Sequence, residues 1–318
     1  MGKFSQSLAK DLSGLKGENF LSCADLTLGQ IESLFELSSQ FKNNLRRIDL
    51  GNRVLGLVFS KASTRTRVSF QVAMARLGGQ TIDLNSHATQ LGRGEPLKDT
   101  ARVLSRYCDC LAIRTFGNEE LFEYSKWASV PVINALTDSE HPCQALADFF
   151  TIQEEFGKVQ GLTLSYIGDG NNVANSLILL GSLLGVNIRL ACPKGFEPPN
   201  HIVEEARKLS RFDSTLEIFN DPYQAVLGSH AIYTDVWASM GQEQEQLERV
   251  KAFKGFKINI ELLKKADPKA IVLHCLPAHR GEEIDNQVME SQSSRIFDQA
   301  ENRLHTQQAL LAACLGGL

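Results

Sequence analysis

Short apolar runs alternate with segments of helical periodicity along most of this chain. The apolar runs have the length and composition of buried strands, and we predict strands at residues 54–59, 111–113, 130–133, 162–167, 186–191, 230–234 and 270–275. Apolar positions recur at helical spacing in other segments, which predicts helices over residues 64–77, 97–107, 142–156 and 306–314. Alternation of strands and helices indicates an α/β fold with mostly parallel sheets that are flanked by helices.

The strand–helix series divides near the middle of the chain. At 318 residues the chain exceeds the usual size of a single hydrophobic core, so two domains are expected. We predict a first domain over residues 1–140 and a second over 141–305, each with its own sheet, joined by interdomain helices. The helix in 306–318 is expected to pack back on the first domain.

Composition narrows the class of partner. Hydrophobic residues make up 43% of the chain and charged residues 22%, which is ordinary for a globular protein. The net charge of −4, without a basic stripe, argues against a nucleic-acid partner but not against a small anionic ligand. No apolar run approaches the ~20 residues of a membrane span, and the N-terminal residues lack the apolar core of a signal peptide. We therefore expect a cytoplasmic protein that has no membrane partner.

The chain has 7 cysteines, scattered along its length. An odd and scattered set is typical of reduced thiols in a cytosol rather than of a disulfide framework. Cys108 and Cys110 are separated by one residue, which is too close for the usual Cys-x-x-Cys half of a zinc site. We expect neither disulfides nor a metal site.

The segment after the first predicted strand carries the clearest sign of ligand chemistry. Between that strand and the body of the next helix lie Ser63, Thr64, Arg65 and Thr66. Free backbone N–H groups and the helix dipole make such a position an anion site, to which hydroxyls donate and a guanidinium adds a planar fork. The alternative is a helix N-cap with two surface arginines. Two arginines interleaved with three hydroxyls favour a phosphate site.

Polar residues at other predicted strand ends are further candidates, because ligands of open parallel sheets bind beyond the carboxyl ends of the strands. Arg114 and Asp235 follow predicted strands, and His141 and Gln144 lie three residues apart at the start of a helix. Each has a structural alternative, namely a surface arginine, a capped turn or a structural histidine.

Cys275 also lies at the end of a predicted strand. Its thiol could be a nucleophile, hold a ligand or fill the core. His274 adjoins it, but neighbours on a strand point to opposite faces. We therefore do not expect these two residues to form a catalytic pair.

The turn Gly168-Asp-Gly170-Asn-Asn-Val173 resembles the start of a dinucleotide-binding fingerprint. Val173 replaces the third glycine of that fingerprint, and no acidic residue for a ribose ends the following strand. The turn is better interpreted as a ligand-facing loop, with an NAD-dependent oxidoreductase as a distant alternative.

Taken together, these segments resemble the carbamoyltransferases. The resemblance rests on Ser-Thr-Arg-Thr-Arg at 63–67, Arg114, His-Pro-x-Gln at 141–144 and His-Cys-Leu-Pro at 274–277, in this order along essentially the whole chain. Asp-x-x-x-Ser-Met-Gly at 235–241 is similar to the members that act on ornithine rather than on aspartate.

The resemblance implies roles for individual residues. It implies that carbamoyl phosphate is bound by Ser63, Thr64, Arg65, Thr66, Gln90, Arg114, His141, Gln144, Cys275, Leu276 and Arg303. It implies that L-ornithine is bound by Asn172, Asp235, Ser239 and Met240. The catalytic residues would be Arg114, His141, Gln144 and Cys275, of which the first three can stabilise negative charge that develops on the carbamoyl oxygen.

The reaction that the resemblance implies is transfer of the carbamoyl group to the side-chain amine of L-ornithine, which gives L-citrulline and phosphate. A tetrahedral intermediate and no metal or cofactor are expected, and arginine biosynthesis is favoured over arginine breakdown. The resemblance also implies a homotrimer in which the loop that carries Gln90 reaches the active site of a neighbouring subunit. A carbamoyltransferase for another acceptor and an inactive ligand-binding relative stay open as alternatives.

Overall fold

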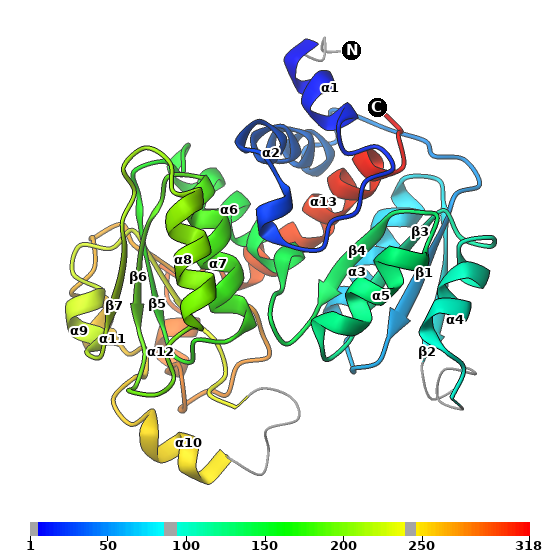
Figure 1. Ribbon diagram of the computed structural model, residues 1–318. Coiled ribbons are helices and arrows are strands. Elements are labelled where there is room, and N and C mark those ends of the chain that lie inside the picture. Colours follow the sequence, from blue (N-terminus) through cyan, green and yellow to red (C-terminus); the bar gives the residue numbers. More distant parts are fainter. Residues whose placement is uncertain (1–5, 86–93, 239–245) are drawn as a thin grey trace. The chain divides into compact units, whose positions relative to one another are not determined.

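The computed structural model describes residues 6–85, 94–238 and 246–318 (Figure 1). Gln90, Ser239 and Met240 therefore lie outside the described residues. None of the helices in the described ranges is long and apolar enough to cross a membrane.

The chain divides into two compact units. Unit 1 consists of Met1–Ala147 with Asn302–Leu318, and unit 2 consists of Asp148–Glu301. The chain passes between the units inside two helices, α6 (Pro142–Phe156) and α13 (Ile296–Cys314). The domain bounds expected from the sequence, after residues 140 and 305, stay a prediction.

Unit 1 is built on a four-stranded sheet in which every pairing is parallel, with the order β2-β1-β3-β4. The strands are β1 (Val54–Phe59), β2 (Gln80–Asn85), β3 (Cys110–Arg114) and β4 (Val132–Leu136). Phe20 forms an isolated parallel bridge with Ile133, so the N-terminal segment covers the free edge of β4. The predicted strands of the first domain and their parallel arrangement are confirmed.

The helices of unit 1 include some that connect its strands. Its described helices are α1 (Gln6–Ser13), the short 3₁₀ helix η1 (Cys23–Asp25), α2 (Leu28–Lys42), α3 (Arg65–Arg76), α4 (Leu97–Leu104) and α5 (Asn118–Trp127). One face of the sheet packs with α4 and α5 through buried residues such as Ala101, Leu121 and Tyr124.

Unit 2 has a five-stranded sheet, again with every pairing parallel, in the order β7-β6-β5-β8-β9. The strands are β5 (Thr163–Ile167), β6 (Asn187–Ala191), β7 (Leu216–Phe219), β8 (Ala231–Thr234) and β9 (Ile271–His274). Strands β5 and β8 are completely buried, whereas β7 at the edge is partly exposed.

Helices flank both faces of the second sheet (Figure 1). They are α7 (Asn172–Leu183), α8 (Asn200–Leu209), α9 (Pro222–Ala225), α10 (Gln246–Ala252), α11 (Ile260–Leu263) and α12 (Asn286–Met289). A buried cluster joins β5, β8 and β9 to the helices from α9 to α12 through residues such as Ile232, Phe253 and Val288.

Two strands were not predicted, and one predicted helix is longer than expected. The strands β2 and β7 each lie at an edge of their sheet. The helix expected at 306–314 is the second half of α13, which already begins at Ile296.

All 7 cysteines are free thiols, and 6 of them are buried. Burial raises the pKa of Cys110, and it raises the pKa of Cys143 to about 12, so both thiols stay protonated at neutral pH. The expectation of reduced cysteines is confirmed, and only Cys275 is partly exposed.

Candidate functional site

The predicted phosphate-binding segment lies at a topological switch point of unit 1. From β1 the chain goes to β2 on one side, and β3 then pairs with β1 on the other side. Loops at the carboxyl ends of two such strands diverge and leave a crevice for a ligand. The backbone N–H of Ser60 donates to the carbonyl of Arg114 at 2.8 Å, which joins the ends of these two strands.

Helix α3 begins inside the Ser-Thr-Arg-Thr-Arg segment. Thr64 is its N-cap residue, but the Thr64 side chain makes no capping hydrogen bond. The first turn contains no acidic residue and carries Arg65 and Arg67, although a helix dipole disfavours cations at this end. Arg67 is paired with Asp83 of β2 at 3.0 Å. An uncapped N-terminus with an extra positive charge has the properties of an anion site.

Arg303 joins three segments of unit 1 that lie far apart in the sequence. Its Nη1 donates to Oε1 of Gln144 at 2.5 Å, and its Nη2 donates to Oγ1 of Thr66 at 3.1 Å. All three side chains are buried. The first turn of α3, the start of α6 and α13 therefore meet at one guanidinium.

His141 lies within the same cluster of charges. Burial lowers the pKa of its imidazole well below the usual value, and the positive charges of Arg303, Arg114 and Arg65 lower it further. The imidazole is therefore neutral at pH 7. Because these three arginines act on one buried histidine, the predicted residues from β3, α3 and α13 are gathered around it.

Arg114 lies at an irregularity of the sheet. The register between β3 and β4 shifts between Ile113 and Arg114, so that Arg114 pairs with Leu136. Such a bulge changes the direction of a side chain at a strand end and is common beside functional sites.

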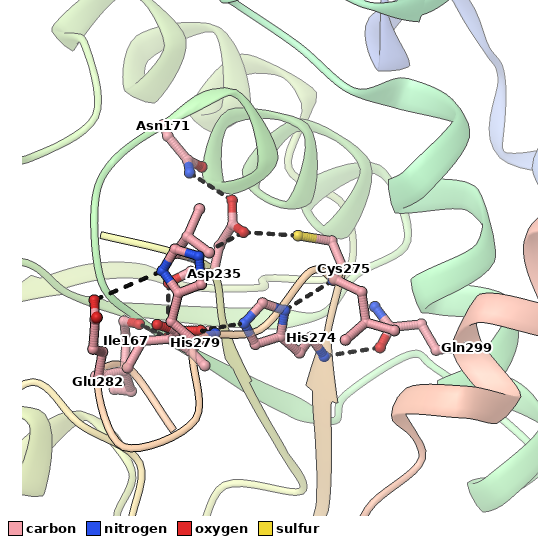
Figure 2. A network of polar contacts seen from close by, with 12 residues as sticks. Ile167, Asn171, Asp235, His274, Cys275, His279, Glu282 and Gln299 are labelled. Carbon is pink, nitrogen blue, oxygen red and sulfur yellow. Dashed lines mark hydrogen bonds and ion pairs between the residues drawn. The ribbon is translucent and has the colours of Figure 1, made fainter. Parts of the chain in front are cut away.

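The second group of predicted residues lies at the switch point of unit 2, between β5 and β8 (Figure 2). Asp235 follows β8, and its Oδ2 accepts a hydrogen bond from Nδ2 of Asn171 at 2.8 Å. Oδ1 of Asn171 accepts from the N–H groups of Val173 and Ala174 at the start of α7. These bonds fix the orientation of the Asn171 amide, so its N–H donors point at the carboxylate.

Asn171 was not assigned from the sequence, whereas its neighbour Asn172 was. Asn171 is the N-cap of α7, and Asn172 is the first, half-buried residue of that helix. A signal was available, since an asparagine that precedes a helix after a strand–glycine turn is a typical N-cap.

Cys275 contacts the same carboxylate from β9. Its Sγ donates to Oδ1 of Asp235 at 2.9 Å, and Oδ1 also accepts the Val236 N–H at 2.8 Å (Figure 2). Both oxygens of the Asp235 carboxylate therefore accept hydrogen bonds, and these bonds fix the orientation of the buried side chain.

Both ring nitrogens of His274 contact groups other than the Cys275 thiol, and one of them holds the following loop. Its Nδ1 accepts the backbone N–H of Leu276 at 2.9 Å, so the ring proton is on Nε2, which lies 3.0 Å from Oε1 of the buried Glu283. Leu276 has a φ of 58°, a left-handed conformation that is costly for a branched side chain. That His274 and Cys275 form no catalytic pair stays a prediction, which the other partners of the His274 ring support. Glu283 is a supporting residue that the sequence pattern did not reveal.

Two groups of side chains in the described ranges have the composition of metal ligands. One is Asp235, His274 and Cys275, and the other is His279, Glu282 and Glu283. In the first group the carboxylate, both imidazole nitrogens and the thiol already make the hydrogen bonds described above. The geometry is that of an internal hydrogen-bond network, and it provides a carboxylate for a cationic ligand group.

Comparison with known proteins gives matches along nearly the whole chain. The carbamoyl-phosphate-binding domain of the aspartate/ornithine carbamoyltransferase family matches residues 18–154, and the Asp/Orn-binding domain of that family matches residues 160–314. An ornithine carbamoyltransferase of Prochlorococcus marinus is 67% identical over 318 residues, which is 100% of both chains.

Solved structures agree with these matches. The ornithine carbamoyltransferase of Gloeobacter violaceus has a TM-score of 0.87 at 51% identity, over 95% of this chain and 99% of that chain. An anabolic ornithine carbamoyltransferase of Campylobacter jejuni has a TM-score of 0.88 at 38% identity, over 93% of this chain and 98% of that chain.

Proposed function

The chain belongs to the aspartate/ornithine carbamoyltransferase family, on its ornithine branch, and from this premise we propose that it transfers the carbamoyl group of carbamoyl phosphate to L-ornithine. The products are L-citrulline and phosphate. The observation that carries the proposal is the convergence of Arg65, Arg114 and Arg303 on the buried, neutral His141 in unit 1.

Carbamoyl phosphate binds in unit 1 under this proposal. Its phosphate lies at the N-terminus of α3, on Ser63, Thr64, Arg65 and Thr66, where N–H groups and guanidinium groups complement a dianion. Gln90 and the residues around His141 complete the set that the family resemblance assigns.

The carbamoyl carbonyl oxygen accepts hydrogen bonds from Arg114, His141 and Gln144. A neutral imidazole can donate one N–H to this oxygen as negative charge develops on it. Arg303 holds Gln144 through a bond to Oε1, so the amide nitrogen of Gln144 is directed elsewhere and can serve as a donor.

L-Ornithine binds in unit 2. Its α-ammonium group lies against Asp235, whose buried carboxylate Asn171 and Cys275 orient. Asn172, Ser239 and Met240 contribute the remaining contacts to the amino-acid end. A buried carboxylate with fixed orientation favours an ammonium over a neutral group.

The chemical step balances with the two substrates alone. The neutral side-chain amine of ornithine attacks the carbamoyl carbon and forms an N–C bond, which gives a tetrahedral intermediate. The C–O bond to phosphate then breaks, and the phosphate leaves with the electron pair and takes the proton from the amine. Cys275 and the backbone of Leu276 position the amine. Most free alkylamine is protonated at pH 7, with a pKa near ~10.4, so removal from water beside arginines favours the reactive form.

Three finer assignments belong to the same proposal. The reaction serves arginine biosynthesis; the ornithine carbamoyltransferase of Campylobacter jejuni, which is 38% identical to this chain, is an anabolic enzyme and supports this direction. The chain works in the cytoplasm, and its free thiols are typical of such a compartment. It assembles as a homotrimer with shared active sites. The exposed edge strand β2, with the exposed apolar side chain of Ile82, supports self-association of unit 1.

The test is product formation from carbamoyl phosphate with ornithine, aspartate, N-acetylornithine and putrescine in parallel. We expect citrulline from ornithine and no carbamoylated product from the other three. Product from another acceptor alone would contradict the ornithine assignment and keep the carbamoyl phosphate site. Binding of both substrates without turnover would identify an inactive relative.

A further inference from the structure

Arg249 of α10 is a buried charge that the proposed mechanism does not use. Its Nη1 donates to Oδ2 of Asp169 at 2.7 Å and to the backbone carbonyl of Trp237 at 2.8 Å. Arg249 is 7% exposed and Asp169 is 8% exposed. Both hydrogens of one guanidinium nitrogen are thus used on two different segments of unit 2.

These two segments are the ones that carry the predicted ornithine site. Asp169 lies in the turn between β5 and α7, two residues before Asn171. Trp237 lies two residues after Asp235, in the segment that follows β8. The bond from Asn171 to Asp235 joins the two segments, and the guanidinium of Arg249 joins them a second time through Asp169 and Trp237.

Aromatic side chains fix the guanidinium and Trp237 in relation to each other. The Arg249 guanidinium lies 5.1 Å from the ring centre of Phe196, and Phe196 packs edge-on against Phe253 at 4.9 Å. Phe253 in turn stacks on Trp237 at 5.8 Å. The Trp237 indole N–H is buried and has no hydrogen-bond partner among the described residues, so its backbone carbonyl is the polar anchor of this residue.

A buried ion pair is weak support for stability, because desolvation of both charges offsets their attraction. Such a pair does fix geometry, since a guanidinium offers its donors at set angles. We propose that Arg249 is a positioning residue for ornithine recognition, and that its bonds to Asp169 and to the carbonyl of Trp237 set the position of Asp235. This inference rests on the proposed function, because it assigns a support to the ornithine side of that site.

The first test compares Arg249→Met with Lys251→Gln. Lys251 is exposed on the same helix, so its variant removes one positive charge without touching the bonds of Arg249. For Arg249→Met we expect the KM for ornithine to rise about tenfold or more, and the KM for carbamoyl phosphate to change less than about twofold. Lys251→Gln should behave as the wild type. An ornithine KM within about twofold of the wild type in Arg249→Met would overturn the inference.

A second variant separates positioning from loss of the fold. Arg249→Met leaves the Asp169 carboxylate buried without its cation, so its Tm should fall. The double variant Asp169→Asn with Arg249→Met removes both charges and should regain most of the Tm, but its ornithine KM should stay raised because the Trp237 carbonyl still lacks its donor. If the ornithine KM returned to normal together with the Tm, Arg249 would be only structural, and the inference would be wrong. A wild-type enzyme that makes no citrulline would instead overturn the proposed function.

Discussion

At the scale of single residues, His141 shows how its surroundings determine a protonation state. Burial and three arginines lower the pKa of His141 well below 6.5 in the folded chain. As the pH falls, His141 is therefore protonated in the unfolded chain before it is protonated in the folded chain. The contribution of His141 to stability is therefore complete above about pH 6.5 and is lost as the pH falls towards its folded-state pKa.

We predict that a bound anion reverses part of this shift. A phosphate dianion beside Arg65, Arg114 and Arg303 offsets their charges and should raise the pKa of His141. A ¹⁵N NMR titration of the imidazole nitrogens, without ligand and with saturating inorganic phosphate, measures both values. His141→Gln identifies the resonances that belong to this residue.

The titration can contradict the proposed site in two ways. A free-enzyme pKa at or above 6.5 would mean that the arginines do not surround the imidazole. A pKa that phosphate leaves unchanged would place the anion elsewhere.

Single residues were predictable where the residue type itself is rare in a structural role. Arg114 ends a strand and His141 precedes a helix, where a long cationic or imidazole side chain has few structural reasons to be buried. Arg303 lies inside α13 and was assigned only through the family resemblance. Asn171 and Glu283 were not found, because each supports another residue through a contact that depends on the folded chain. Glu283 reaches His274 from the loop that follows β9, and no spacing rule foretells that contact.

At the scale of secondary-structure elements, the N-terminus of α3 has two arginines with different partners. Arg65 contributes positive charge to the cluster at His141, whereas Arg67 is paired with Asp83 and lies over Phe59. They are two residues apart and equal in charge, so they form a matched pair for mutation.

We predict that Arg65→Ala weakens carbamoyl phosphate binding much more than Arg67→Ala. A charge-assisted hydrogen bond to phosphate contributes on the order of 2 kcal/mol, which corresponds to about a thirtyfold rise in KM. Arg67→Ala removes a partly exposed ion pair that contributes under about 1 kcal/mol, so its KM should change only slightly. Initial rates over a range of carbamoyl phosphate concentrations give both values. Equal effects of the two variants would show that general charge, rather than the position of Arg65, binds the phosphate.

The strands that the sequence pattern predicted are mostly those that are buried on both faces. Strands β1, β3, β5 and β8 lie inside their sheets and have continuous apolar runs, as strands buried on both faces do. The strand β2 (Gln-Thr-Ile-Asp-Leu-Asn) and the strand β7 (Leu-Glu-Ile-Phe) mix polar and apolar residues because each is an edge strand. Such short mixed runs cannot be told from loops by periodicity alone.

The first part of α13 was hidden for a related reason. Many of its buried residues are polar, among them Gln299, Asn302 and Arg303, so the helix has no simple apolar stripe. Gln299 accepts the His274 N–H and donates to Asp148 and to Tyr233, all within unit 2. Arg303 holds Gln144 and Thr66 in unit 1. Because these buried positions of α13 hold polar residues that make hydrogen bonds, the sequence lacks the apolar periodicity by which the start of the helix could be predicted.

At the scale of the whole molecule, each unit carries one half of the proposed chemistry. The anion cluster lies entirely in unit 1, and the carboxylate network of Asp235 and Cys275 lies entirely in unit 2. The α/β class and both parallel sheets could be predicted from alternation alone. Which residues meet around His141 could not, because strand order within the sheet brings β1 and β3 together, and periodicity does not specify strand order.

The proposed homotrimer with shared active sites leads to a prediction about mixed subunits. If Gln90 serves the site of a neighbouring subunit, Arg65→Ala and Gln90→Ala should each impair every site of their own homotrimer. In a mixed trimer, a Gln90→Ala subunit supplies an intact Arg65, and an Arg65→Ala neighbour supplies an intact Gln90, so one complete site forms. Purification through both tags removes the two homotrimers, and each mixed trimer has one complete site out of three, so about one third of the wild-type activity should be recovered. Co-expression of two differently tagged chains, purification through both tags and an assay of citrulline formation measure this recovery. A light-scattering mass of three chains checks the assembly.

Since a site confined to one subunit gains nothing from a neighbour, activity that stays at the average of the two parent variants would show that Gln90 acts within its own chain.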